Sequence, residues 1–106
     1  MQVNIKADNF ELTPALTDYI EKKITMLDKY LEDIQPVVCD FQAELISRHH
    51  LKGDIFRAEI NLELPGELLR IEKTEPDLYK AIDKVKDHLA QMIIKYKKKK
   101  YERKVE

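Results

Sequence analysis

The chain begins with a short alternation of apolar and polar residues. Val3, Ile5 and Ala7 fall on one face of an extended segment, and Asn4 and Lys6 fall on the other. A period of two with a single apolar face is typical of a strand that is buried on one side. The first element is therefore predicted to be a half-buried strand.

A helix is predicted between Thr13 and Pro36. The Thr13 hydroxyl can cap free backbone amides, Pro14 suits the first helical position, and Pro36 ends the element. Between these points the apolar residues recur at spacings of three and four, which places them on one stripe of a helix. The stripe consists of Leu16, Ile20, Ile24, Leu27, Leu31 and Ile34.

Alternation with a period of two returns after Pro36 and is interrupted twice. A polar stretch at residues 47–54 is predicted to be a loop, and Pro65-Gly66 is predicted to be a tight turn. The alternating segments predict three more strands, at residues 37–47, at residues 55–64 and around Leu69 and Ile71.

The last predicted element is a helix that opens at Pro76. Its core-facing stripe consists of Leu78, Ile82, Val85, Leu89, Met92, Ile93 and Tyr96. Each predicted strand has one polar face, so we expect a sheet that is exposed to water on one side and covered by both helices on the other. The predicted fold class is α+β: a two-layer β-α-β-β-β-α sandwich with a four-stranded sheet and two helices on one face.

Charge is distributed unevenly along the 106 residues, whose formal net charge is −1. That total alone argues against binding to nucleic acid. Residues 1–79, however, contain nine Lys or Arg and 16 Asp or Glu, a balance of −7, whereas residues 80–106 contain ten and four, a balance of +6. An acidic body with a basic end suggests an anionic partner for that end.

The basic residues of the second predicted helix gather opposite its core stripe. The exposed stripe holds Lys80, Lys84, Asp87, Gln91, Lys95 and Lys98, flanked by Lys86 and Lys97. Such a face can simply be solubilising, since lysines are favoured near a helix C-terminus by its dipole. The long one-sided run beside an acidic body instead favours phosphate contact, and lysine, a point charge, suits the RNA backbone more than base reading.

The polar face of the predicted sheet is acidic and carries no aromatic residue on which a base could stack. Its carboxylates would repel phosphate, so we expect RNA on the helical side or at the edge. The face consists of Gln42, Glu44, Arg57, Glu59, Asn61, Glu63, Arg70 and Glu72.

Nothing in the sequence indicates catalysis. Cys39, the single cysteine, is predicted to be a buried structural thiol that forms no disulfide within the chain. The adjacent His49 and His50 lack a third ligand nearby, so they are predicted to be exposed loop residues, with extra RNA contacts as the alternative. Tyr79 and Tyr96 are predicted to edge the core rather than to stack on bases. Without a nucleophile–base pair, a glycine-rich phosphate loop or a spaced Cys/His set, we expect no enzyme activity, metal, cofactor or small-molecule substrate.

Targeting signals are not recognisable either. Lys6 and Asp8 interrupt the start of the chain, and no apolar run of the length of a membrane span follows. The expected location is therefore the cytoplasm, with no membrane contact.

Two segments resemble one known family. The first is Phe10–Leu16 (FELTPAL), which runs on to Lys22-Lys23 and to Leu27–Tyr30 (LDKY), and the second is Asp77–Asp83 (DLYKAID) before a lysine-rich helix end. Together with the element order, they resemble the ribosome hibernation-promoting factor and protein Y family, also called sigma-54 modulation proteins or ribosome-associated inhibitors. The resemblance covers essentially the whole chain.

This resemblance implies a fold similar to double-stranded-RNA-binding domains and, as the partner, the small ribosomal subunit with its rRNA. Family members occupy the channel used by messenger RNA and by transfer RNA in the A and P sites, which blocks translation in idle ribosomes. Such a translation inhibitor requires occupancy and no chemistry. The resemblance implies ribosome dimerisation only where a C-terminal domain or a partner is added.

The resemblance also implies a basic RNA-binding face drawn from both helices. Where the family carries basic residues in the middle of the second helix, this chain has His88 and Gln91, and His88 could be a weak, pH-dependent phosphate contact. The residues carried over to the RNA-binding face are Lys22, Lys23, Lys29, Lys84, Lys86, His88, Lys95, Lys97, Lys98 and Lys99.

The expected organisation is a ribosome-binding domain at residues 1–96 and a loosely attached basic tail at residues 97–106. Short family members end here, whereas long ones add a linker and a small dimerising domain, so the chain resembles either a short form or the N-terminal domain of a long form. A second functional hypothesis is a protein-interaction module, in which the acidic sheet face binds a basic partner such as a transcription factor.

Overall fold

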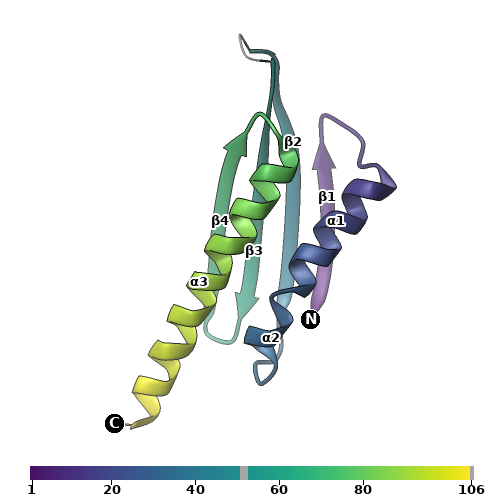
Figure 1. The fold of residues 1–106 in the computed structure, drawn as a ribbon. Coiled ribbons are helices and arrows are strands. Elements are labelled where there is room, and N and C mark those ends of the chain that lie inside the picture. The colour runs from purple at the N-terminus through teal and green to yellow at the C-terminus, as the bar shows by residue number, and fades with distance from the viewer. Residues whose placement is uncertain (51–52, 106) are drawn as a thin grey trace.

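Seven helices and strands make up the computed structural model, which describes residues 1–50 and 53–105 (Figure 1). They follow one another as β1 (Gln2–Asp8), α1 (Pro14–Thr25), α2 (Asp28–Leu31), β2 (Val38–His50), β3 (Gly53–Leu64), β4 (Glu67–Glu75) and α3 (Leu78–Val105). This succession confirms the α+β class that the hydrophobic pattern predicts.

The four strands form one mixed sheet in the order β1-β2-β3-β4. β1 runs parallel to β2, with Gln2 opposite Val38, because the chain crosses back through α1 and α2 before it enters β2. The pairs β2–β3 and β3–β4 are antiparallel and follow one another directly along the chain. In the β3–β4 turn, Gly66 has a φ of 78°, a left-handed value that glycine adopts at little cost.

Both long helices lie on the same face of the sheet, with α1 beside β1 and α3 over β3 and β4 (Figure 1). The core fills the space between the two layers and includes Ile20, Leu27, Phe41, Ile60 and Leu89, all almost fully buried. The other face of the sheet is open to water, as the alternation in the strands predicts.

Side-chain caps start both long helices. The Thr13 hydroxyl accepts a hydrogen bond from the backbone N–H of Leu16 at 3.1 Å, and Pro14 occupies the first turn, as predicted. A carboxylate oxygen of Asp77 accepts from the backbone N–H of Tyr79 at 3.0 Å. The second long helix therefore starts close to the predicted position.

The single helix predicted up to Pro36 is divided in the structure, so that prediction is wrong. The backbone N–H of Leu27 donates to the Ile24 carbonyl oxygen at 2.9 Å, and that of Ile34 donates to the Leu31 carbonyl oxygen at 3.0 Å. These bonds reach three residues back instead of four, which tightens the turns and breaks the regular helix. Because Leu27, Leu31 and Ile34 stay buried, the hydrophobic spacing alone does not reveal the break.

The loop predicted at residues 47–54 is largely strand. β2 extends to His50 and β3 begins at Gly53, and these two residues are paired. Register shifts interrupt the pairing toward this end, and the hairpin projects beyond the other strands (Figure 1). The prediction is wrong because a hairpin that projects past the core can pair its backbone without an apolar face.

α3 continues without a break through residues 97–105, which the sequence sets apart as a loosely attached tail. Tyr96 is the last core residue of the helix, and its hydroxyl donates to the Pro65 carbonyl oxygen at 2.7 Å. Beyond Tyr96 the helix runs past the end of the sheet (Figure 1). The basic segment is therefore helical, which sets the angular positions of Lys97–Lys100 around the axis.

Candidate nucleic-acid interface

The predicted RNA-binding lysines do not form one patch, because α3 carries them on two flanks. One flank faces α1 and α2, where Lys86 lines a hollow together with Lys29 and Tyr30. On the other flank Lys84 pairs with Glu75 of β4. We call the lysines on the first flank, together with Lys23 of α1, which contacts α3, the groove row. The groove row consists of Lys23, Lys29, Lys86 and Lys97, and the outer row, on the second flank, consists of Lys84, Lys95, Lys98 and Lys99.

The cations of the groove row already have internal partners. Lys23 Nζ lies 3.2 Å from Asp83 Oδ1, and Lys97 Nζ lies 3.8 Å from Asp33 Oδ1. Exposed ion pairs of this kind contribute little to stability, so a phosphate oxygen can replace the carboxylate at small cost. The remaining contacts in this row are Lys86 with Asp87 and Lys29 with the ring of Tyr30.

Fewer lysines of the outer row are paired with a carboxylate. Lys95, Lys98 and Lys99 are exposed and make no ion pair with any residue that the structure describes. Lys84 is the exception, because its ammonium group pairs with Glu75 and lowers the pKa of that carboxyl group. Uncompensated ammonium groups are the ones most available for phosphate.

Two more of the predicted residues are exposed on the helical layer. Lys22 lies on α1 and forms no ion pair within the described part of the chain, and His88 lies on α3. The structure thus places all ten predicted residues on the helices, but distributes them over the outer row, the groove row, the surface of α1 and, for His88, the exposed surface of α3.

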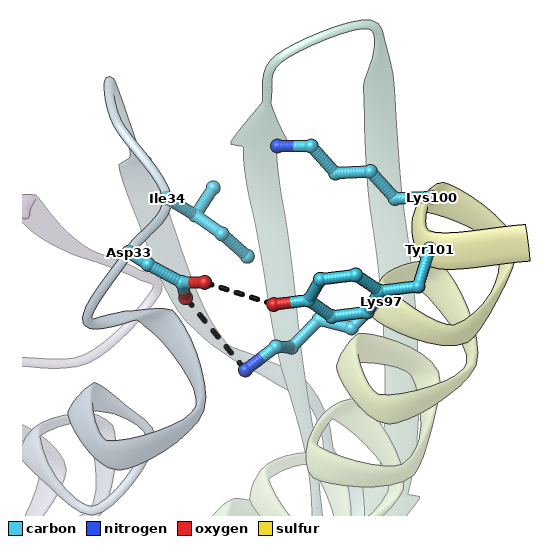
Figure 2. Close-up of a pocket in the computed structure, with 5 residues that line it drawn as sticks. All are labelled: Asp33, Ile34, Lys97, Lys100 and Tyr101. Carbon is cyan, nitrogen blue, oxygen red and sulfur yellow. Dashed lines mark hydrogen bonds and ion pairs between the residues drawn. The ribbon is translucent and has the colours of Figure 1, made fainter. Parts of the chain in front are cut away.

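Asp33 holds the overhanging end of α3 against the end of the α2 region (Figure 2). The Tyr101 hydroxyl donates a hydrogen bond to Asp33 at 3.0 Å, and Lys97 approaches the other carboxylate oxygen. Ile34 and Lys100 complete the lining of this hollow. The hydrogen bond from Tyr101 lowers the pKa of Asp33 below its ordinary value, and Lys97 and Lys100 act in the same direction.

The two tyrosines predicted to edge the core differ in the structure. Tyr96 is buried as predicted, whereas Tyr79 is 41% exposed, so the prediction for Tyr79 is wrong. Tyr79 lies on the flank of α3 that faces α1, where its ring contacts Tyr19. A hydrogen bond to Asp83, together with burial, raises the pKa of Tyr19 to about 12.

On the open face of the sheet, Glu59 is 6% exposed even though its strand position faces water. Arg57 and Asn61 each donate a hydrogen bond to its carboxylate at 3.0 Å, and Arg70 donates one at 2.9 Å. Burial by itself raises the pKa of Glu59, but the bonds from Arg70 and Asn61 outweigh it and hold the pKa below the ordinary value. Central carboxylates of this face are thus occupied by its own guanidinium groups, which gives no support to an acidic docking surface.

Among the side chains that the structure describes, the remaining reactive groups form no recognisable site. Cys39 is fully buried, and burial raises the pKa of its thiol to about 12, so the group stays protonated at neutral pH. His49 and His50 belong to β2, and their side chains lie outside the described residues. Over the described ranges, 1–50 and 53–105, no three His, Cys, Asp or Glu are grouped as metal ligands, and no helix is both long and apolar enough to cross a membrane.

Sequence reasoning misses the carboxylates that face these lysines. Asp33 and Asp83 lie far from Lys97 and Lys23 along the chain, so no local spacing connects them. The one local signal is the position of Tyr101, four residues after Lys97 on the same flank of a helix.

The fold and this surface together define a class: a small α+β sandwich whose helical layer is basic and whose open sheet face is acidic. The chain belongs to the sigma 54 modulation protein / S30EA ribosomal protein family, whose model matches residues 3–101. The family expected from the two sequence motifs is therefore confirmed.

Relatives from several bacteria carry the name ribosome hibernation promotion factor or ribosome hibernation promoting factor. A ribosome hibernation promotion factor of Lactococcus lactis subsp. cremoris is 34% identical over 97 residues, which cover 92% of this chain and 50% of that protein. The ribosome hibernation promoting factor of Azotobacter vinelandii is 32% identical over 103 residues, which cover 97% of this chain and 89% of that protein. The chain thus spans about half the length of the Lactococcus relative and most of the Azotobacter one.

Solved structures share the fold. The N-terminal domain of Thermus thermophilus Protein Y superimposes with a TM-score of 0.76 at 34% identity, covering 91% of this chain and 99% of that one. A ribosomal subunit interface protein from Coxiella burnetii gives a TM-score of 0.72 at 23% identity, over 92% of this chain and 98% of that one. The second likeness shows the fold alone.

Proposed function

We propose that this chain is a ribosome-associated translation inhibitor that binds the small ribosomal subunit and blocks translation in idle ribosomes. Its family and the names of its relatives support ribosome binding. The proposed contact is with rRNA phosphates in the channel used by messenger RNA and transfer RNA. The chain would act in the cytoplasm by steric exclusion, with no catalytic step, metal or cofactor.

The observation that carries this proposal is the exposed, uncompensated charge of the outer row. Lys95, Lys98 and Lys99 are exposed near the C-terminal end of α3, whereas the opposite face of the molecule is acidic. An anionic surface can therefore approach only the helical layer. Each ammonium group that neutralises a phosphate releases a counterion, which makes binding favourable and sensitive to salt.

The groove row would supply a second line of contacts. Lys23 and Lys97 are held in place by carboxylates of α3 and of the end of α2, at the surface of the same layer. A phosphate that displaces these carboxylates binds ammonium groups whose positions are already restricted, so less side-chain freedom is lost on binding. Because each exchange breaks an existing ion pair, we expect a smaller contribution per lysine here than in the outer row.

The proposed functional unit is the domain at residues 1–96, with residues 97–106 as a basic extension. Ribosome dimerisation is proposed to require an added C-terminal domain or a partner. No described residue of this chain is assigned to it.

Co-sedimentation of the purified chain with isolated small subunits over a salt series tests the proposal. Four to six phosphate contacts predict a log–log slope of roughly −3 to −5. Lys95→Glu and Lys98→Glu should each weaken binding and reduce the steepness of the slope by about one. The matched control is Lys6→Glu, which changes the charge equally but lies on exposed β1, away from the helical layer, and should bind like the wild type.

Two outcomes would contradict the proposal. The first is absence of binding at low salt by a chain that is folded by circular dichroism. The second is an equal loss of binding in Lys6→Glu and Lys95→Glu, because that result would mean that net charge, and not the helical layer, decides association.

A further inference from the structure

Tyr79 is an exposed aromatic side chain that its neighbours hold in place. Its ring centroid lies 4.8 Å from that of Tyr19, with the ring planes at 74°. The Tyr19 hydroxyl in turn donates to Asp83 at 2.5 Å, and Lys23 Nζ lies 5.3 Å from the centroid of the Tyr19 ring. An edge-to-face contact with a ring that is itself anchored restricts Tyr79 while 41% of it stays exposed.

The charges around this ring suit a base better than a phosphate. Lys80 is exposed beside Tyr79, but Asp77 caps the same helical turn, and Asp83 is already shared by Tyr19 and Lys23. Two carboxylates this close would repel a phosphate that approached the ring directly. A neutral nucleobase can lie on an aromatic ring, while Lys80 remains available for the phosphate beside it.

The position of Tyr79 links it to the proposed interface. It lies in the first turn of α3, on the flank that also carries the groove row, and Lys23 belongs to both groups. An RNA strand that follows the groove row toward the start of α3 therefore reaches this ring. Stacking needs a base that is not covered by a neighbouring base, so the ring distinguishes single-stranded from paired RNA.

We propose that Tyr79 is a stacking site for an unpaired nucleobase of the RNA that binds the helical layer. This inference rests on the proposed function and adds to it the class of ligand at one end of the interface: single-stranded RNA, or an unstacked base in a loop or bulge. Tyr19 acts here as a positioning residue, because it orients Tyr79 without facing the ligand itself.

The test compares Tyr79→Ala, Tyr79→Phe and Lys80→Gln, all checked for folding by circular dichroism. The probes are isolated small subunits, a single-stranded oligoadenylate, and the same strand paired with oligouridylate. Tyr79→Ala should bind subunits and oligoadenylate about tenfold more weakly, with an unchanged salt slope, because it removes stacking and no charge. Tyr79→Phe keeps the ring and should bind like the wild type, whereas Lys80→Gln should reduce the steepness of the slope by about 0.7.

Each alternative outcome is distinct. Wild-type affinity of Tyr79→Ala for subunits would overturn the stacking site and leave the proposed function intact. An equal loss on single-stranded and paired probes would overturn it in favour of backbone contact. A loss on subunits with no loss on oligoadenylate would mean that the ring docks on a ribosomal protein. Failure of the wild-type chain to bind subunits would instead reject the proposed function.

Discussion

Glu59 shows that neighbouring side chains can bury a residue whose strand position faces water. Alternation places Glu59 on the water-facing side of β3, yet the side chains of Arg57, Arg70 and Asn61 cover it and bond to it. A carboxylate removed from water needs such partners, because an unpaired buried charge is costly. The open face is thus held together by its own polar network and is not a loose set of solvated charges.

Glu59→Gln should destabilise the fold by about 1–3 kcal/mol, because charged hydrogen bonds to two guanidinium groups are weakened. Urea unfolding measures the loss, and the control is Glu63→Gln, an exposed neighbour on the same face of β3 that should change little. The native pKa of Glu59 lies below its ordinary value of 4.5, so its contribution is present above that pH and is lost as pH falls through the native pKa. The difference between wild type and Glu59→Gln should therefore shrink in acid, and a constant difference would contradict this explanation.

At the scale of elements, α3 has two parts that differ in what they pack against. The part of α3 up to Tyr96 packs on β3 and β4, and it could be predicted because its apolar stripe has a clear helical period. After Tyr96, none of the described side chains at residues 97–102 is buried, and helices without tertiary packing are marginal in water. Contacts such as those of Lys97 and Tyr101 with Asp33 connect this last part to the rest of the domain (Figure 2).

Asp33→Asn should increase the hydrogen-exchange rate of the backbone amides around Tyr101 several-fold, because the charged hydrogen bond and the pairing with Lys97 are both weakened. The matched control is Glu32→Gln, which removes an exposed charge from the preceding residue and should leave these amides unchanged. Equal exchange rates in the wild type and in Asp33→Asn would show that the end of α3 is ordered without this contact.

The two wrong element predictions have a common physical cause. A tightened turn between α1 and α2 preserves the spacing of buried residues, so periodicity cannot report it. Likewise, the projecting end of the β2–β3 hairpin has no core to face, so alternation gives no signal there. Hydrophobic patterns detect segments that pack on a core, and they give no signal where the local structure depends on backbone hydrogen bonds alone.

On the scale of the whole molecule, charge separation accompanies an elongated shape. The principal extents are 54, 25 and 18 Å, and α3 and the β2–β3 hairpin project at opposite ends (Figure 1). The acidic body and the basic helix end, with balances of −7 and +6, therefore give the molecule a polarity that can orient it toward an anionic surface before contact.

Removal of residues 97–106 should separate folding from binding. Tyr96, the last core residue of α3, is kept, so the melting temperature should change by only a few degrees. Three predicted contacts are lost, Lys97, Lys98 and Lys99, so the salt slope of subunit binding should become less steep by about 2–3. Complete unfolding of the truncated chain would contradict the division into a domain and a basic extension.

The sequence by itself determined the α+β class, the order of strands and long helices, the core stripes, the family and the concentration of positive charge near the end of the chain. These features follow from local periodicity, turn chemistry and charge counts, which need no knowledge of distant contacts. Only the tertiary structure decided which lysines pair with Asp33, Asp83 or Glu75 and which pair with no described residue, and that Tyr79 is exposed against Tyr19. Those properties depend on side chains that are brought together from separate elements, and no spacing along the chain encodes their distances.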